Sequence, residues 1–489
     1  MKYILGIDIG TTNTKAVAYD LQGKPVAQAN STYPFISEHE RFHELDPRAL
    51  FNAVIDVMKG VLDKIPPEQL AGVSFSSAMH GLIAVDDKGE PLTNMITWAD
   101  LRSHEYAMRL KDTDVGHKIY ERTGTPIHAM SPLCKLMWMK ENLTEVFNKA
   151  HKFISIKEYV FYHFFGEFVI DHSIASSTGL FDIYELDWNK DALNAAGVTA
   201  NRLSALVKTT HVVTGLSARY AEMFGISGDT PFIIGASDGC LAHIGSNALG
   251  KGDVSLTIGT SGAVRMMVDK PAYDPKERIF NYVLMDNAYL SGGPLNNGGN
   301  VMQWFAKGFL QKDFSATEEF SDCIAEACAI SPGADGLIFL PYIYGERAPV
   351  WDADAKGIFY GVSSVHTSAH FMRAIMEGIS FALLEILSIM EETIGTAANI
   401  YASGGFIRSE KWKQLLADVL GRTICVTHAE DSSAAGAGML GMLALGFKKD
   451  LDEMREFFSV KETFEPDLND RDVYLKNYKI YSELYLRFK

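Results

Sequence analysis

Two glycine–threonine loops in this sequence have the composition of anion-binding turns. The first is GIDIGTTNTK at residues 6–15, and the second is LTIGTSGA at residues 256–263. Glycine lets the backbone approach a ligand closely, and successive N–H groups in such a turn point into one concavity that binds phosphate. Thr11 and Thr12 add hydroxyl donors, and Lys15 adds a positive charge unless it faces outward, which is an equal alternative.

Acidic residues near these loops suit the metal and the proton transfer of a phosphoryl-transfer reaction. Asp8 cannot bind phosphate itself, but it could hold the water shell of Mg²⁺, an ion that typically keeps waters and uses one or two carboxylates. Asp238 ends the apolar run PFIIGAS and is the best candidate for the base that accepts the proton of an acceptor hydroxyl. The alternative for an isolated aspartate at this place is a helix N-cap.

Polar residues in the first half could bind a polyhydroxylated acceptor. His80 lies in the small-residue loop of SSAMHGLIAVD and could hydrogen-bond a polyol, although a lone histidine is more often structural. Asp100 and Arg102 in TWADLRS suit a polyhydroxylated or acidic ligand, with a plain salt bridge as the alternative.

Two further glycine loops suit the remainder of a nucleotide. In YASGGFIRSEKWKQLLADVLG, at residues 401–421, a short strand leads into two glycines, and Ser409 is placed to cap an amphipathic helix. Such a junction could hold adenosine against the backbone; a simple tight turn is the alternative. GGPLNNGGNVMQW, at residues 292–304, could line the same cleft. Together the loops predict an ATP cleft.

The elements that would position these residues occur twice. The chain opens as strand, turn, strand, turn and strand, followed by a helix over residues 45–65 with Asp46 as N-cap and Pro47 in its first turn. About half a chain length later, DVSLTIGTSGAVRMMVD repeats the order of apolar strand, Gly-Thr loop and apolar strand. This predicts a duplicated α/β domain with a cleft between the copies and a boundary near residues 244–252.

Composition favours a soluble enzyme of two or more domains. The chain has 489 residues, of which 47% are apolar, and a formal charge of −16, which argues against nucleic-acid or anionic-membrane partners. Its five cysteines form no CxxC pair, which favours a reducing compartment. The opening YILGIDIG lacks the pattern of a signal peptide, and the apolar run at residues 378–390 is too short to cross a bilayer. We expect a cytoplasmic location.

These motifs resemble the FGGY family of carbohydrate kinases, within the actin/hexokinase-like superfamily. Besides the glycine loops, MSPLCKLMWMKEN at residues 130–142 and GIFYGVSSVHTSAHFMRAIME at residues 357–377 match the two family signatures. The resemblance implies two actin-like (ribonuclease H-like) α/β domains with the active site between them. Residues 1–245 would bind the sugar and carry the first phosphate loop, and residues 246–489 would carry the second loop and the adenosine site.

The same resemblance implies roles for individual residues. Asp238 would be the catalytic base, and Met79 and His80 would hold the place of the family's substrate pair. ATP and Mg²⁺ would be required, and a homodimer is expected from the resemblance alone. The nucleotide would be lined by Gly259 and Thr260 at the γ-phosphate, by Gly299 and Gln303, and by Gly404, Gly405 and Arg408 at the adenosine end.

Within the family, stretches such as ITWADLRS, GASDG and PGADGLIFLPYIYGERAPVWD are most similar to bacterial gluconate kinases. The implied reaction converts D-gluconate and ATP to 6-phospho-D-gluconate and ADP. The carboxylate of gluconate needs basic partners, and the candidates are His80, Arg102, His128 and Arg347. Gly81 departs from the serine of many gluconate-type members, and Met-His-Gly is also the pattern of xylulose kinases, so D-xylulose is the main competitor.

Two further classes of protein are less favoured alternatives. A non-kinase actin-like ATPase would turn over ATP without phosphorylating a sugar. A sugar-responsive regulator would need DNA-binding helices, and none precede the first phosphate loop.

Overall fold

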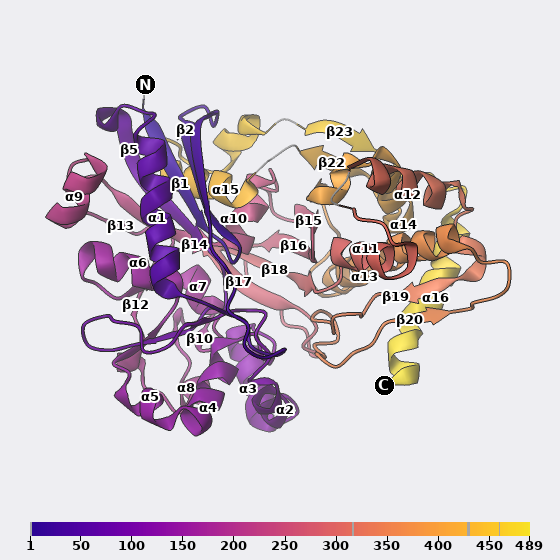
Figure 1. Cartoon of the computed structure of the whole chain (residues 1–489), viewed down its shortest axis with the longest axis horizontal. Helices are drawn as coiled ribbons and strands as arrows, with labels where there is room; N and C mark the ends of the chain where they lie inside the picture. Colours follow the sequence, from indigo (N-terminus) through magenta and orange to yellow (C-terminus); the bar gives the residue numbers. More distant parts are fainter. Residues whose placement is uncertain (1, 315–316, 428–430, 459) are drawn as a thin grey trace.

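Two large mixed sheets form the framework of the computed structural model, which describes residues 2–314, 317–427, 431–458 and 460–489 (Figure 1). The first sheet has the strand order β13-β14-β5-β1-β2-β3, and the second has the order β17-β18-β16-β15-β21-β22-β23. The first comprises β1 (Tyr3–Ile9), β2 (Asn13–Asp20), β3 (Pro25–Thr32), β5 (Leu70–Ser77), β13 (Val212–Val213) and β14 (Phe232–Ser237). The second comprises β15 (Val254–Ile258), β16 (Gly262–Val268), β17 (Phe280–Met285), β18 (Ala288–Leu295), β21 (Ile400–Ser403), β22 (Ile424–Thr427) and β23 (Val460–Phe464).

The two sheets share one internal topology. In the first, β1 pairs antiparallel with β2 and parallel with β5, which pairs parallel with β14. In the second, β15 pairs antiparallel with β16 and parallel with β21, which pairs parallel with β22. The two Gly-Thr loops therefore occupy equivalent turns, β1–β2 and β15–β16. This confirms the duplicated α/β architecture predicted from the repeat.

Helix α1 (Pro47–Leu62) covers one face of the first sheet, with its apolar residues buried against β2 and β3. The carboxylate of Asp46 accepts a hydrogen bond from Arg48 N at 2.9 Å, which confirms the predicted N-cap. The same half contains α2 (His104–Lys111), α3 (Asp114–Thr123), α4 (Pro132–Asn142), α5 (Thr144–Lys149), α6 (Ile156–Phe165), α7 (His172–Ser176), α8 (Lys190–Ala196) and α9 (Ala218–Phe224). In Figure 1, α2, α3, α4, α5 and α8 lie below the sheet, and α9 lies at its left edge beside β13.

Two helices cross between the sheets, α10 (Asp238–Gly245) and α15 (Ser432–Ala444) (Figure 1). Their close approach depends on glycine: a Cβ at Gly436 would stand 2.0 Å from the carbonyl oxygen of Leu241, and one at Gly6 would stand 2.2 Å from that of Ala434. Helix α15 thus belongs to the second half of the sequence but packs on β1 and β5 of the first. The division between residues 245 and 246 stays a prediction.

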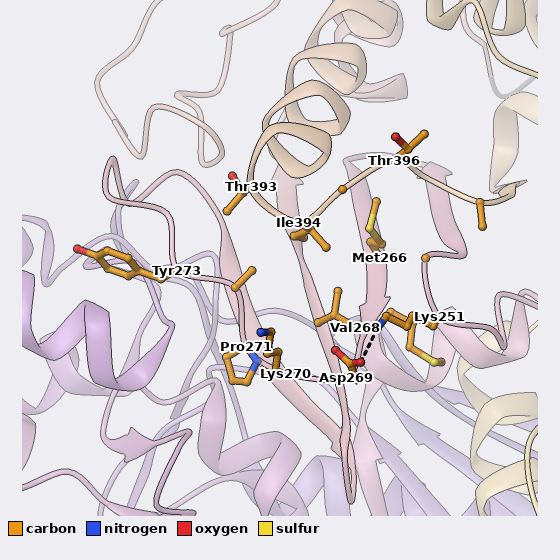
Figure 2. Close-up of a pocket in the computed structure, with 15 residues that line it drawn as sticks. Lys251, Met266, Val268, Asp269, Lys270, Pro271, Tyr273, Thr393, Ile394 and Thr396 are labelled. Carbon is orange, nitrogen blue, oxygen red and sulfur yellow. Dashed lines mark hydrogen bonds and ion pairs between the residues drawn. The ribbon is translucent and has the colours of Figure 1, made fainter.

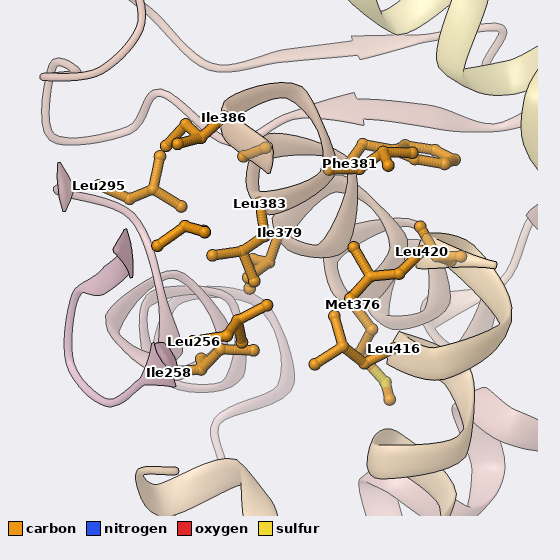
Figure 3. Close-up of a cluster of buried hydrophobic side chains, with 14 of the residues drawn as sticks. Leu256, Ile258, Leu295, Met376, Ile379, Phe381, Leu383, Ile386, Leu416 and Leu420 are labelled. Atoms are coloured by element: carbon orange, nitrogen blue, oxygen red, sulfur yellow. The ribbon is translucent and has the colours of Figure 1, made fainter. Parts of the chain in front are cut away.

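The second half buries its largest apolar cluster around the long helix α13 (Ser368–Thr393) (Figure 3). Met376, Ile379 and Leu383 of this helix pack between the second sheet and α14 (Glu410–Leu420). Each such side chain contributes about 1.5–3 kcal/mol through burial. The half also contains α11 (Gly299–Phe305), α12 (Thr317–Ala329), α16 (Arg471–Phe488), β19 (Ile338–Leu340) and β20 (Ile358–Tyr360). In the described part of the chain, every helix is too short or too polar to cross a membrane.

Candidate active site

Asp238 lies where β14 passes into α10, on the side of the first sheet that faces the second. It is the first residue of the helix, and Ser237 takes the N-cap position that the sequence left open for Asp238. Residues of α6 and α7 hold this junction in place. Lys157 Nζ donates to Ala236 O at 3.0 Å, and Ser237 N donates to Ser173 Oγ at 3.1 Å. These contacts hold the carboxylate at a fixed place between the two halves.

Burial raises the pKa of Asp238, and the opposing hydrogen bond from Gly239 N, at 2.7 Å, lowers it. Burial, together with the negative charges of Asp238 and Asp431, raises the pKa of Asp8 to about 7. The Ser76 hydroxyl donates to Asp8 Oδ1 at 2.7 Å. Carboxylates concentrated in this way disfavour one another's charge, so the loop side of the cleft is suited to a cation.

His80 is held in an unusual conformation in the loop after β5. Its φ is +66°, in the left-handed region that non-glycine residues rarely adopt. Its Nδ1 lies 2.7 Å from Ser177 O and must donate to that carbonyl, and burial lowers its pKa to about 3. The ring is therefore neutral, and its Nε2 is a hydrogen-bond acceptor suited to a substrate hydroxyl. The ring centroid lies 6.0 Å from that of Tyr282.

Lys135, in the middle of the first family signature, fixes this loop. Its fully buried ammonium donates to His80 O at 2.5 Å, to Thr97 O at 2.8 Å and to Ile96 O at 3.3 Å. It therefore ties the His80 loop to the segment that carries Trp98. Nothing in the sequence pattern distinguished this lysine from a surface lysine of the helix.

Asp100 and Arg102 are paired with each other, which is the salt bridge that the sequence left open. Arg102 Nε and Nη2 each donate to the Asp100 carboxylate at 2.8 Å, and Nη2 also donates to Glu44 at 2.6 Å. The guanidinium stacks on Phe42, with its carbon 4.0 Å from the ring centroid. Both side chains are buried and have protein partners, and any direct contact of theirs with substrate stays a prediction.

The first phosphate loop is a tight turn in which Gly10 N donates to Asn13 O at 3.0 Å. Thr11 is partly exposed and Thr12 is exposed, so both can reach a ligand in the cleft. Lys15 points to α15 and forms an ion pair with Asp431. This contact links the two halves of the chain beside the loop. Lys15 therefore has a structural partner, as the alternative interpretation of this lysine allowed.

The second phosphate loop packs directly on the start of α11. Gly299 N donates to Gly259 O at 2.7 Å, and Asn300 N donates to Thr260 O at 3.2 Å. A Cβ at Gly299 would stand 2.9 Å from Gly259 O. The two glycine-rich segments that the sequence placed in one cleft are therefore in contact.

A cavity of about 450 Å³ adjoins this loop. Six of the residues expected to contact nucleotide line it together, namely Gly259, Thr260, Gly299, Gln303, Gly405 and Arg408. Gly404 supports its wall: at φ +105°, a Cβ there would stand 2.3 Å from Ile258 O. Phe314, Phe320 and Trp412 also line the cavity and were missed because aromatic residues in helices and loops are ordinarily core residues. They provide the flat apolar surface that a base ring needs.

A cavity of about 630 Å³ opens elsewhere, between the segment after β16 and the end of α13 (Figure 2). Lys251 and Asp269 form an ion pair at its rim. None of the predicted site residues lines it.

The basic candidates for a substrate carboxylate separate clearly. His80 is neutral, and Arg102 already pairs with Asp100, so neither is a free cation for a substrate carboxylate. His128 and Arg347 are buried beside the cleft. Arg265 on β16 joins them and was not predicted, because an arginine in the apolar run GAVRMMV gives no sign of what it faces. Its guanidinium lies against Gly239, the residue after Asp238, and its charge lowers the pKa of Asp238.

Comparison with known proteins gives two family matches that together span most of the chain. The model described as the FGGY family of carbohydrate kinases, N-terminal domain, matches residues 3–245, and that of the C-terminal domain matches residues 254–445. A gluconokinase of Bacillus subtilis is 43% identical over 91% of this chain and 88% of its own length. A xylulose kinase of Staphylococcus epidermidis is 31% identical over 99% of this chain and 97% of its own length.

Among solved structures, the gluconate kinase from Lactobacillus acidophilus has a TM-score of 0.94 and 37% identity, with both chains fully covered. The ligand-bound xylulose kinase from Lactobacillus acidophilus has the same TM-score with 36% identity and the same coverage. These likenesses confirm the two-domain α/β fold, but the near-equal values do not separate the two substrates.

Proposed function

The chain belongs to the FGGY family of carbohydrate kinases, and from that premise we propose that it transfers the γ-phosphoryl group of ATP to D-gluconate. The products are 6-phospho-D-gluconate and ADP. The observation that carries the proposal is the position of Asp238, fixed between the acceptor-side loop of His80 and the half of the molecule that holds the nucleotide cavity. The higher identity to gluconokinases than to the matched xylulose kinases supports gluconate as the acceptor.

Asp238 acts as the general base. It accepts the proton of the terminal hydroxyl of gluconate as that oxygen forms a bond to the γ-phosphorus. The bond from the γ-phosphorus to the bridging oxygen of ADP breaks, and its electron pair leaves with ADP. Anchoring by Lys157 and Ser173 holds the carboxylate in position for this transfer.

The loops stabilise the charge of the transferring group. The N–H groups of the two Gly-Thr turns and the hydroxyls of Thr11, Thr12 and Thr260 are the donors for the phosphates. Mg²⁺ would supply charge neutralisation, and Asp8 is the residue that would hold its water shell. The fit to a cation rests on the buried Asp8 carboxylate and on the neighbouring charges of Asp238 and Asp431.

Met79 and His80 orient the acceptor. The neutral His80 ring offers Nε2 as an acceptor for a substrate hydroxyl, and Lys135 keeps the loop in its left-handed conformation. Asp100 and Arg102 pair with each other and position the loop that carries Trp98, and their direct contact with the acceptor stays a prediction.

D-Xylulose is the second candidate, favoured by one observation. Gly81 follows Met79 and His80 as in xylulose kinases, whereas many gluconate-type members have serine. In the structure, a Cβ at Gly81 would stand 2.9 Å from Met95 Sδ, so this glycine has a packing role that is independent of substrate. We therefore give Gly81 less weight than the overall identity.

The test is a coupled ADP-release assay with MgATP and a panel of D-gluconate, D-xylulose, L-ribulose and glycerol. Gluconate should give the highest kcat/KM. A preference for xylulose would replace the acceptor and keep the mechanism, whereas ADP release that no acceptor stimulates would contradict the proposal.

A further inference from the structure

Three buried nitrogen-bearing side chains lie around Asp238 and His80, and each lacks a partner that such a group normally has. They are Arg265 on β16, Arg347 in the segment after β19, and His128 in the loop before α4. One nitrogen of Arg265 and one of His128 have no hydrogen-bond partner among the described residues, and Arg347 has hydrogen bonds but no ion pair there. Buried polar atoms in folded proteins almost always have hydrogen-bond partners, so each exception needs an explanation.

Arg265 is the clearest exception. Its Nε is buried and has no hydrogen-bond partner among the described residues. Its strand partner on β18 is Gly292, which has no side chain to cover it. A Cβ at Gly239 would stand 3.2 Å from Arg265 Nε and 2.8 Å from Met79 Cε, so the guanidinium lies against the residue after the proposed base. The charge of Arg265 lowers the pKa of Asp238, which is consistent with this position.

Arg347 and His128 extend this group. Arg347 lies 4.9 Å from the Trp98 ring centroid, and its Nε and Nη2 donate only to neutral oxygens, those of Asn296 at 2.8 Å and Leu295 at 2.9 Å. His128 Nδ1 accepts from Met130 N at 3.1 Å, so the proton of this neutral ring is on Nε2. That Nε2 is buried and has no partner among the described residues.

The chemistry of the three groups indicates one kind of ligand. Each offers N–H donors, two are cationic, and in the described chain neither guanidinium forms an ion pair with a carboxylate. A neutral hydroxyl can occupy one donor but cannot offset two buried guanidinium charges. A carboxylate only accepts hydrogen bonds, has two oxygens and matches the planar fork of a guanidinium.

We propose that Arg265, Arg347 and the Nε2–H of His128 bind the carboxylate of a sugar-acid substrate and thereby set the preference for an aldonate over a neutral polyol. This inference rests on the proposed function, because it assigns the specificity of the same acceptor site. An anion could also come from ATP, since Arg265 adjoins Asp238, and the experiment separates the two sources.

The experiment measures binding by calorimetry and kcat/KM in the ADP-release assay, with D-gluconate and with D-glucitol. D-Glucitol has the same carbon skeleton but a CH₂OH group in place of the carboxylate. The variants are Arg265→Gln and Arg265→Lys. The matched control is Arg219→Gln, which removes the same charge from the exposed surface of α9.

Arg265→Gln should weaken gluconate binding about 100-fold, within the range for truncating one partner of a buried charge pair. The affinity for glucitol should change less than about threefold, because glucitol has no carboxylate for Arg265 to bind. A change of that size is within the error expected for a mutation at an independent site. Arg265→Lys should recover part of the gluconate affinity, and Arg219→Gln should match the wild type. The melting temperature of Arg265→Gln without ligand should not fall, because the buried Nε has no hydrogen bond to lose among the described residues and removal of a buried charge offsets the lost attraction to Asp238.

Four results would overturn the inference. If Arg265→Gln lowers kcat for both acceptors equally and leaves gluconate affinity unchanged, Arg265 acts on the transferring phosphoryl group or on Asp238. If the variant unfolds at a clearly lower temperature, the guanidinium is structural. If the wild type prefers a neutral sugar, both this inference and the proposed acceptor are wrong. If the wild type prefers gluconate and Arg265→Gln binds gluconate with unchanged affinity, only this inference is wrong.

Discussion

Lys135→Met removes the buried ammonium that holds the His80 loop. The ammonium donates to three backbone carbonyls, those of His80, Thr97 and Ile96, at 2.5, 2.8 and 3.3 Å. Methionine keeps an unbranched side chain of similar length, so the change leaves little cavity and mainly removes the donors.

The expected loss of stability follows from these contacts. Each carbonyl left buried without a donor costs about 1–3 kcal/mol. Removing the charge recovers part of that sum, because burying an ammonium itself costs several kcal/mol. The net loss should be about 2–4 kcal/mol in the free energy of unfolding, below the full 3–5 kcal/mol of a broken buried ion pair. His80, at φ +66°, should relax toward a common conformation.

The assay is denaturant unfolding together with steady-state kinetics, and Lys140→Met on the exposed side of the same helix is the control. The KM for the acceptor should rise about tenfold or more, which corresponds to 1.4 kcal/mol of binding. The KM for ATP should stay within about twofold, because contacts beyond 7–10 Å act nearly independently. Stability equal to that of the control, or an equal rise in both KM values, would refute this explanation of how His80 is held.

Four more predictions concern catalysis, pH dependence, metal and nucleotide. Asp238→Asn should lower kcat by about 10²–10⁴-fold, the range for a lost general base, with ATP affinity retained in a binding titration; full activity would rule out Asp238 as the base. Because burial raises the pKa of Asp238, the acid limb of the wild-type kcat/KM profile should lie above the ordinary value of 3.8, and a limb at or below that value would contradict the assigned environment. Asp8→Asn should raise the Mg²⁺ concentration for half-maximal rate, and an unchanged Mg²⁺ titration would remove Asp8 from the metal site. Gly404→Ala should raise the KM for ATP about tenfold by pushing Ile258 from the cavity wall, whereas Gly395→Ala, also at positive φ but with no atom within 4 Å, should not.

Local features of the fold were predictable from the sequence because they depend on neighbouring residues. Asp46 caps α1 and Ser409 caps α14, where Ser409 Oγ accepts from Trp412 N at 3.3 Å. The repeated Gly-Thr turn predicted the duplicated sheet, since both copies place the turn at the same point of the strand order. The resemblance to the family then predicted that Asp238 and His80 share one cleft.

Contacts made between the halves were not predictable. Arg265 is one charge in an apolar strand, and only the folded structure shows that its guanidinium lies against Gly239. Lys15 was open to two interpretations until Asp431, more than four hundred positions away, settled its partner. Trp412 reads as a core residue of α14 and is both buried and part of the cavity wall. The homodimer and the cytoplasmic location stay predictions.

The most direct test of the central claim is a competition in one vessel. D-Gluconate and D-xylulose at equal concentrations would share the enzyme with MgATP, and mass spectrometry would follow both phosphorylated products at early times. The ratio of initial rates then equals the ratio of the two kcat/KM values. We predict that 6-phosphogluconate exceeds xylulose 5-phosphate by about tenfold or more, equivalent to 1.4 kcal/mol in the transition state. An excess of xylulose 5-phosphate would contradict gluconate as the acceptor.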